Sequence, residues 1–137
     1  MGETLMNIAD SRPVYVQLIE RIYTMVLSGE YPPGAKLPAV RELAEMMRAN
    51  PNTVQRALFY LEEQGLIYTQ RTTGKYITDD KVVIEQARQS LARDYADEYL
   101  QKMRRIGLGR DSSLGYIKET EEKQGGTDRI QKPDQAV

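Results

Sequence analysis

The stretch from Asn50 to Leu61 constrains the fold more than any other part of the chain. Asn50 is a favoured helix N-cap, and Pro51 suits the first helical position, where its missing N–H costs nothing. Apolar residues then recur at helical spacing, as Val54, Ala57, Leu58 and Leu61. This period predicts an amphipathic helix that begins at Pro51 and buries one face in a core.

The opposite face of this helix begins with a group of hydrogen-bonding side chains. They are Asn52, Thr53, Gln55 and Arg56. Asn and Gln amides pair bidentately with adenine, and an Arg guanidinium binds guanine or a phosphate. Recognition helices read DNA mainly through their N-terminal residues. The face is therefore a candidate DNA-reading surface, although an ordinary solvated helix face would have the same composition.

The composition argues against several classes of function. The 137 residues contain no Cys and no His, which removes disulfides, thiol chemistry and the commonest metal ligand. No carboxylate pair lies in an apolar pattern, so the sequence indicates no enzyme, no metal site and no cofactor. Apolar runs of ~18 residues and a signal peptide are also absent, and we expect a soluble, cytoplasmic protein with no membrane partner.

The overall charge gives little support to nucleic-acid binding. The net charge is −1 and the isoelectric point is about 5.6. From residue 36 to residue 77, however, there are six basic and four acidic residues, which is a local net charge of +2. Charge therefore permits DNA binding without requiring it.

Two further helices are predicted before the Asn50–Leu61 stretch. The first begins at Pro13 and ends at Gly29, which suits a left-handed C-cap. A turn rich in Pro and Gly follows, and residues 40–47 show the pattern of a short helix. Three residues join this short helix to the next. That is the arrangement of a helix-turn-helix, although a generic helical hairpin would look similar.

A β-hairpin is predicted directly after the helix pair. Residues 66–69 and 75–78 are β-prone, and residues 72–74 form a turn between them. Arg71 and Lys75 flank the tip, where they would suit a phosphate or minor-groove contact. The predicted fold class is thus mainly α with a small β-hairpin, a winged helix-turn-helix followed by a C-terminal helical segment.

Several short runs of residues in the first half of the chain together form a family signature. They are Pro13-Val-Tyr-Val-Gln17, Ser28-Gly29, Pro33-Gly-Ala-Lys-Leu-Pro-Ala-Val-Arg-Glu-Leu-Ala44, Asn50-Pro-Asn-Thr-Val54, Arg56-Ala57, Leu61-Glu62, Gln64-Gly-Leu-Ile67 and Gly74-Lys-Tyr-Ile77. In this order they resemble the GntR family of bacterial winged-helix transcription regulators, over about residues 6–78. The short C-terminal remainder is most similar to the small YtrA-like branch.

The resemblance implies which residues contact DNA. By position they are Arg41, Asn50, Asn52, Thr53, Gln55, Arg56, Thr73, Gly74 and Lys75. Arg56 has an alternative role, because it could pair with Glu42 or Glu63 and stabilise the helix. Two residues depart from the family pattern: Ala39 replaces the Ser of a capping box, and Thr72 replaces the first wing glycine.

The C-terminal part of the sequence is predicted to be helical. A long helix over 79–106 and a second helix to about residue 123 follow the DNA-binding domain of residues 1–78, and we expect residues 124–137 to be disordered. The resemblance implies that residues 79–123 form a homodimer. The candidate interface residues are Leu91, Tyr95, Tyr99 and Met103. A monomeric helix that packs on its own domain is the alternative.

The sequence therefore predicts a sequence-specific transcription regulator, a repressor that binds a pseudo-palindromic, double-stranded DNA operator as a homodimer. The alternative is a winged-helix protein-interaction module that does not bind DNA, which the acidic isoelectric point favours. Neither the operator sequence nor a small-molecule effector is identified by the residues.

Overall fold

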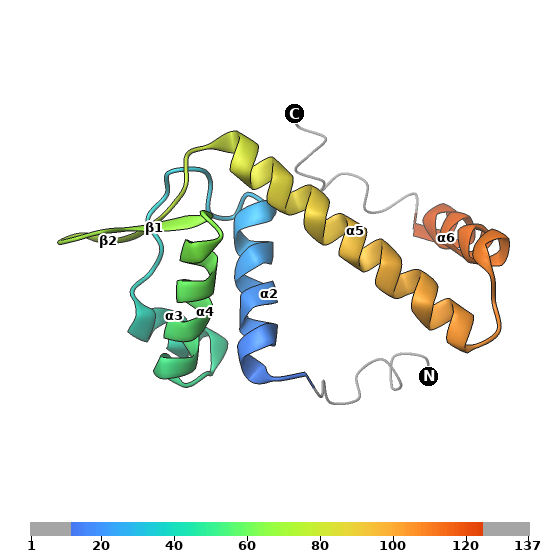
Figure 1. The fold of residues 1–137 in the computed structure, drawn as a ribbon, viewed down its shortest axis with the longest axis horizontal. Helices are drawn as coiled ribbons and strands as arrows, with labels where there is room; N and C mark the ends of the chain where they lie inside the picture. The colour runs from blue at the N-terminus through green and yellow to red at the C-terminus, as the bar shows by residue number, and fades with distance from the viewer. Residues whose placement is uncertain (1–11, 125–137) are drawn as a thin grey trace. The chain divides into compact units, whose positions relative to one another are not determined.

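The computed structural model describes residues 12–124, which divide into two compact units (Figure 1). The first unit runs to Val83, and the second begins at Ile84. The elements are α2 (Val14–Leu27), α3 (Val40–Met47), α4 (Pro51–Glu63), β1 (Ile67–Gln70), β2 (Gly74–Ile77), α5 (Lys81–Arg105) and α6 (Arg110–Gln124). Of the tail predicted to be disordered, Gln124 is instead the last residue of α6, and residues 125–137 lie outside the described residues.

The predicted fold class is confirmed. Helices α2, α3 and α4 precede an antiparallel hairpin of β1 and β2, and two further helices follow. The boundary between the units falls between Val83 and Ile84, within the first turn of α5. It therefore lies a few residues beyond the predicted end of the winged helix at Thr78.

A shared aliphatic core holds the three helices of the first unit together. The core residues are Leu18, Ile22 and Val26 from α2, Leu43, Ala44 and Met47 from α3, and Val54, Ala57, Leu58 and Leu61 from α4. Burying each large aliphatic side chain contributes about 1.5–3 kcal/mol. The predicted apolar stripe of α4 is thus confirmed as its buried face.

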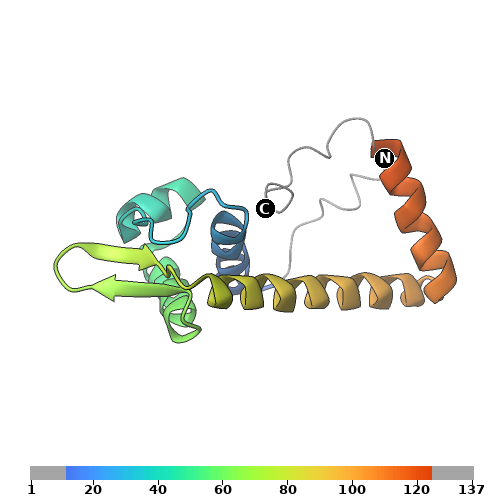
Figure 2. The ribbon, with the colours of Figure 1, turned by 90° about the horizontal axis from the view of Figure 1, so that it is seen from above.

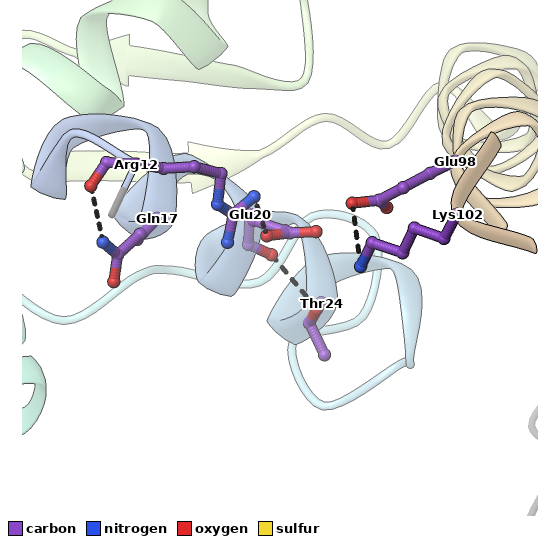
Figure 3. A network of polar contacts seen from close by, with 6 residues as sticks. All are labelled: Arg12, Gln17, Glu20, Thr24, Glu98 and Lys102. Carbon is purple, nitrogen blue, oxygen red and sulfur yellow. Dashed lines mark hydrogen bonds and ion pairs between the residues drawn. The ribbon is translucent and has the colours of Figure 1, made fainter. Parts of the chain in front are cut away.

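The start of α2 lies one residue later than predicted, because Pro13 is its N-cap and not its first helical residue. The Arg12 guanidinium pairs with Glu20 at 2.8 Å, and the Gln17 amide donates to the Arg12 carbonyl at 2.8 Å (Figure 3). Farther along α2, the Thr24 hydroxyl donates to the Glu20 carbonyl. Figure 3 also draws a separate pair on α5, between Glu98 and Lys102.

Both ends of α4 form as the sequence predicts. At the start, the Asn50 side-chain oxygen accepts a hydrogen bond from the Asn52 backbone N–H at 2.7 Å. At the end, Gly65 has φ +82°, and the Leu66 N–H donates to the Leu61 carbonyl at 3.1 Å. Because Leu66 closes the helix in this way, β1 begins one residue later than predicted.

The hairpin is joined to the body along β2. The Leu37 N–H donates to the Lys75 carbonyl at 2.8 Å, and the Ile77 N–H donates to the Ala35 carbonyl at 2.8 Å. A cross-strand stack of Tyr68 on Tyr76, with ring centroids 5.6 Å apart, stabilises the pairing of the two strands. Figures 1 and 2 show the hairpin extending away from α2.

In the second unit, α5 and α6 meet at a steep angle (Figure 2). Gly107 has φ +88°, and the Leu108 N–H donates to the Met103 carbonyl, which ends α5. Helix α6 begins at Arg110, earlier than the predicted cap at Asp111–Ser112. The Tyr99 hydroxyl donates to the carbonyl of the buried Ser113 at 2.7 Å, which ties the two helices together.

The turn between α3 and α4 contains a strained residue. Arg48 has φ 54° and ψ 50°, and it occupies the left-handed position at the end of α3 that glycine usually takes. The N–H of Arg48 donates to the Glu45 carbonyl, and the Ala49 N–H donates to the Ala44 carbonyl. These two hydrogen bonds hold Arg48 in a conformation that L-residues rarely adopt.

Replacing Arg48 with Gly is expected to raise the free energy of unfolding by roughly 0.5–1 kcal/mol, because the left-handed conformation costs an L-residue more than glycine loses in chain entropy. Urea unfolding followed by circular dichroism measures the change. Arg48→Ala is the matched control, since it removes the charge and keeps the strain. An equal gain in the Ala variant would assign the effect to charge and contradict the backbone explanation.

Candidate nucleic-acid interface

The packing of α4 fixes which of its side chains face solvent. With Val54, Leu58 and Leu61 buried, the opposite face carries Asn52, Gln55, Arg56 and Phe59, all exposed. Asn50 is exposed at the N-cap, and Thr53 is half-buried. The polar residues predicted at the start of this helix therefore lie together, in the first two turns.

Asn50 caps the helix with one part of its side chain. Its side-chain oxygen is used by the helix cap, so its amide N–H groups are the part available to a ligand. Asn52 and Gln55 lie one turn apart and present complete amides to solvent. An exposed amide with both a donor and an acceptor is the group that pairs bidentately with adenine.

Arg56 is held by an aromatic ring instead of a carboxylate. Its guanidinium carbon lies 4.2 Å from the centre of the Tyr15 ring, at the beginning of α2. Among the described residues neither Glu42 nor Glu63 pairs with Arg56, so the alternative partners suggested by the sequence are wrong. Stacking leaves the edge of a guanidinium free to donate hydrogen bonds, so Arg56 remains able to bind a base or a phosphate.

The beginning of α3 lies next to a candidate phosphate contact. Arg41 is exposed in the first turn of this helix. Ala39 is the N-cap and offers no side-chain hydrogen bond, but the Glu42 carboxylate accepts a hydrogen bond from the Ala39 backbone N–H at 3.0 Å. One of the two hydrogen bonds of the capping box therefore forms, although Ala39 replaces the Ser of the family pattern.

The tip of the hairpin, which we call the wing tip, consists of Arg71, Thr72 and Thr73 between Gln70 and Gly74. Arg71 and Thr73 are exposed. Gly74 has φ +128°, and a Cβ atom there would lie 3.1 Å from Cε of Lys36. The Lys36 side chain thus crosses over Gly74 and adds a positive charge beside the wing tip.

Lys75 does not lie free at the wing tip as predicted. Its ammonium lies 3.0 Å from the Glu62 carboxylate and 2.9 Å from the Thr69 hydroxyl, and Thr69 also donates to Glu62. Only 22% of the Lys75 side chain and 23% of the Glu62 side chain are exposed. We call Glu62, Thr69 and Lys75 the wing clamp, because they join the last turn of α4 to both strands of the hairpin.

The wing clamp changes the ionisation of its carboxyl group. Partial burial raises the pKa of Glu62, but hydrogen bonds from Thr69 and Lys75 and the charge of Lys75 outweigh that effect. The net result is a pKa below the ordinary value of 4.5. Glu62 is therefore ionised at neutral pH and neutralises a lysine that the sequence assigns to DNA.

Two exposed residues of this surface were missed by sequence reasoning. Lys36 joins the wing through its bridge with Tyr76 and through its side chain over Gly74, and such contacts between distant residues have no local sequence signal. Phe59 is 59% exposed on the polar face of α4. Its position outside the apolar stripe was visible in the sequence, because it follows Leu58 without sharing the spacing of the buried set.

An open cleft of about 1040 Å³ lies between α3 and the hairpin. Its lining includes Glu42, Glu45 and Met46 from α3, Lys36, and the hairpin residues from Thr69 to Lys75. Both signs of charge meet in this cleft. Between residues 12 and 124 no group of three or more acidic side chains is arranged to hold a metal ion. No helix in that range has the length and apolar character needed to cross a membrane.

Residues 14–77 match the family described as bacterial regulatory proteins, gntR family. YhcF, an HTH-type transcriptional regulator of Bacillus subtilis strain 168, is 32% identical over 108 residues, which are 79% of this chain and 89% of YhcF. The chain belongs to the GntR family.

Two further comparisons extend over most of both chains. YtrA, an HTH-type transcriptional repressor of Bacillus subtilis strain 168, is 34% identical over 110 residues, covering 80% of this chain and 85% of YtrA. A GntR family transcriptional regulator from Listeria monocytogenes has a TM-score of 0.74 and 39% identity, covering 82% of this chain and 98% of that one. The predicted resemblance to the YtrA-like branch is confirmed. This GntR protein is a transcriptional regulator with a winged helix-turn-helix DNA-binding domain, and not an enzyme.

Glu62→Gln is expected to remove a pH-dependent part of the stability. Because the folded pKa of Glu62 is below 4.5, its carboxylate stabilises the fold at neutral pH. That contribution is lost as the pH falls below 4.5 and through the folded pKa. Urea unfolding should show the wild type more stable than the variant at neutral pH, with the difference shrinking in acid. A difference that stays constant with pH would contradict this role. Glu63→Gln is the control for loss of a charge on the same helical turn.

Proposed function

We propose that this GntR protein is a transcriptional repressor that binds a pseudo-palindromic operator as a homodimer. The observation that supports it best is the exposed polar face at the start of α4, where Asn52, Gln55 and Arg56 project from a helix held by its buried side. These side chains suit base edges in the major groove. Repression is inferred from YtrA, which is named a transcriptional repressor and matches over 85% of its length.

The groups around α4 suit the DNA backbone. Arg41 at the start of α3 and Arg71 at the wing tip are exposed cations on either side of the reading face, and Lys36 adds a third. Phosphate contacts of this kind fix the register of a protein on the duplex without reading sequence. Thr73 is exposed at the wing tip, where its hydroxyl suits a phosphate oxygen. At Gly74 the group that would meet DNA is the Lys36 side chain that crosses over it.

One copy of this domain reads few base pairs, which is too little to select an operator from a genome. Two copies related by a two-fold axis would read two half-sites about one helical turn apart. We assign the contact between copies to the second unit, whose exposed apolar side chains are Tyr95, Ile106, Leu114, Tyr116 and Ile117.

The four interface residues suggested by the sequence differ in exposure. Tyr95 is exposed, whereas Leu91, Tyr99 and Met103 are half-buried, and Tyr99 donates to Ser113 within the same chain. The proposed interface is therefore centred on α6 and the end of α5, with Leu91 and Met103 at its margin. A single unit with several apolar side chains in solvent is stabilised when a second copy covers them.

The alternative function is a winged-helix module that binds protein and not DNA. The isoelectric point of about 5.6 and the exposed Phe59 ring favour it. Selection from a random duplex library with the full chain separates the two functions. Recovery of a two-fold symmetric consensus supports the repressor, and recovery of no preferred sequence would exclude it.

Gln55→Ala and Arg71→Ala are expected to affect DNA binding in different ways, the first on the selected duplex alone and the second on any DNA. Loss of Gln55 should weaken binding to that duplex by about 1–3 kcal/mol and change binding to random DNA little, because a base contact is lost. Loss of Arg71 should weaken binding to both DNAs, because a phosphate contact is lost. It should also reduce the salt slope, the slope of log K against the logarithm of salt concentration, by about one. Fluorescence anisotropy at several salt concentrations measures both. Gln64→Ala, at the far end of α4, is the control, and equal losses on both DNAs from Gln55→Ala would rule out base reading.

Leu114→Asp combined with Ile117→Asp is expected to convert the dimer to a monomer, because two charges would be buried in the contact between copies. The monomer should keep its helical circular dichroism and bind the selected duplex at least tenfold more weakly, in roughly the range expected when one of two linked sites is lost. Light scattering measures the mass. Thr120→Asp, exposed on α6, is the control. A wild-type monomer, or a dimer that survives the double change, would refute the assignment.

A further inference from the structure

The hairpin is attached to the body on two sides. Along β2, backbone hydrogen bonds join Lys75 and Ile77 to the segment of residues 35–37. On the side of α4, the attachment includes the wing clamp, in which the Glu62 carboxylate contacts Lys75 and Thr69. Backbone bonds along one edge leave rotation about that edge possible, whereas a second attachment from α4 prevents it.

The wing clamp contacts the hairpin directly below the wing tip. Thr69 and Lys75 are partners across the two strands, and the next pair, Gln70 and Gly74, closes the wing tip. The connection from α4 to β1 is only residues 64–66, with Gly65 at φ +82°. The Glu62 carboxylate binds the hairpin at the Thr69–Lys75 pair, one pair below the wing tip. It therefore fixes the angle between α4 and the wing tip.

We propose that Glu62 is a positioning residue for DNA binding, which holds the wing tip at the angle where Arg71 reaches the duplex while Gln55 reads it. This inference rests on the proposed function. Lys75 then acts through Glu62 as part of the wing clamp and makes no phosphate contact. The sequence instead predicts that Lys75 binds DNA directly.

Glu62→Gln separates the two roles of Lys75. If Lys75 acts within the wing clamp, Glu62→Gln and Lys75→Met should each weaken binding to the selected duplex by roughly fivefold, the effect expected from one partly buried ion pair. Both should also lower the salt slope alike, because both weaken the phosphate contact of Arg71. If Lys75 instead binds a phosphate, Glu62→Gln would free it and keep or raise affinity, while Lys75→Met would lower the slope by about one. That second pattern would overturn the inference. Glu63→Gln, on the same turn, is the control.

A charge swap keeps the test independent of folding defects. Lys75→Glu alone should bind weakly, and adding Glu62→Lys re-forms the ion pair with the charges exchanged. Recovery to within about threefold of the wild type supports the wing clamp, because the pair is restored while the charge at position 75 stays reversed. A swap variant that binds no better than Lys75→Glu would overturn it.

A double-mutant cycle between Glu62 and Arg71 tests positioning directly, because a general loss of stability would not couple the two residues. In the wild type, Arg71→Ala should weaken binding; in the Glu62→Gln background the same change should have at most half that effect on a logarithmic scale, because the wing tip no longer reaches the DNA. Additive effects would show that Glu62 does not position Arg71. Failure of the wild type to select any duplex would overturn the proposed function, whereas a selected duplex bound equally by Glu62→Gln would overturn only this inference.

Discussion

Burial of the apolar face of α4 is the constraint on which the rest of the DNA-binding unit depends. Val54, Ala57, Leu58 and Leu61 are at most 1% exposed, so the helix has one possible rotation about its axis. At 3.6 residues per turn, that rotation places the polar residues of the first two turns in solvent. The exposure of this candidate DNA-reading surface is therefore a consequence of core packing. Asn50 determines where the surface begins, because it caps the helix immediately before Pro51.

Features that depend on neighbours within one helical turn could be predicted from the sequence. The period of α4, its cap at Asn50 and its end at Gly65 are of this kind, and the structure confirms each of them. The turn at Arg48 has the same hydrogen bonds as the one at Gly65, but a left-handed arginine has no signal in a sequence. It can be recognised only from the backbone, since the geometry that usually requires glycine is imposed here by the short connection between two packed helices.

Contacts between distant parts of the chain explain what the sequence could not predict about the site. Arg56 had two carboxylates within reach along its own helix pair, yet it stacks on Tyr15 because α2 packs beside α4. The sequence predicted a free Lys75 at the hairpin tip, yet Glu62 in the last turn of α4 forms an ion pair with it. In the second unit, a helical stripe did not show whether Tyr99 would meet another chain or α6 of its own chain. Periodicity identifies a buried face, but it does not name the partner that covers it.

The acidic isoelectric point is compatible with DNA binding once the partners of the acidic groups are considered. Between residues 36 and 77, Glu62 is neutralised by Lys75, and Glu42 accepts the N–H that opens α3. Many of the remaining carboxylates belong to α5 and α6, where Glu98 and Glu119 pair with lysines of their own helices. Charges within the Debye length of the duplex, about 8 Å at physiological salt, determine the field there. The cations Arg41, Arg71 and Lys36 are exposed around the proposed DNA-binding face. In the function proposed here, so few phosphate contacts would give modest affinity from charge. The proposed base contacts at the start of α4 and the proposed second copy would then supply the selectivity.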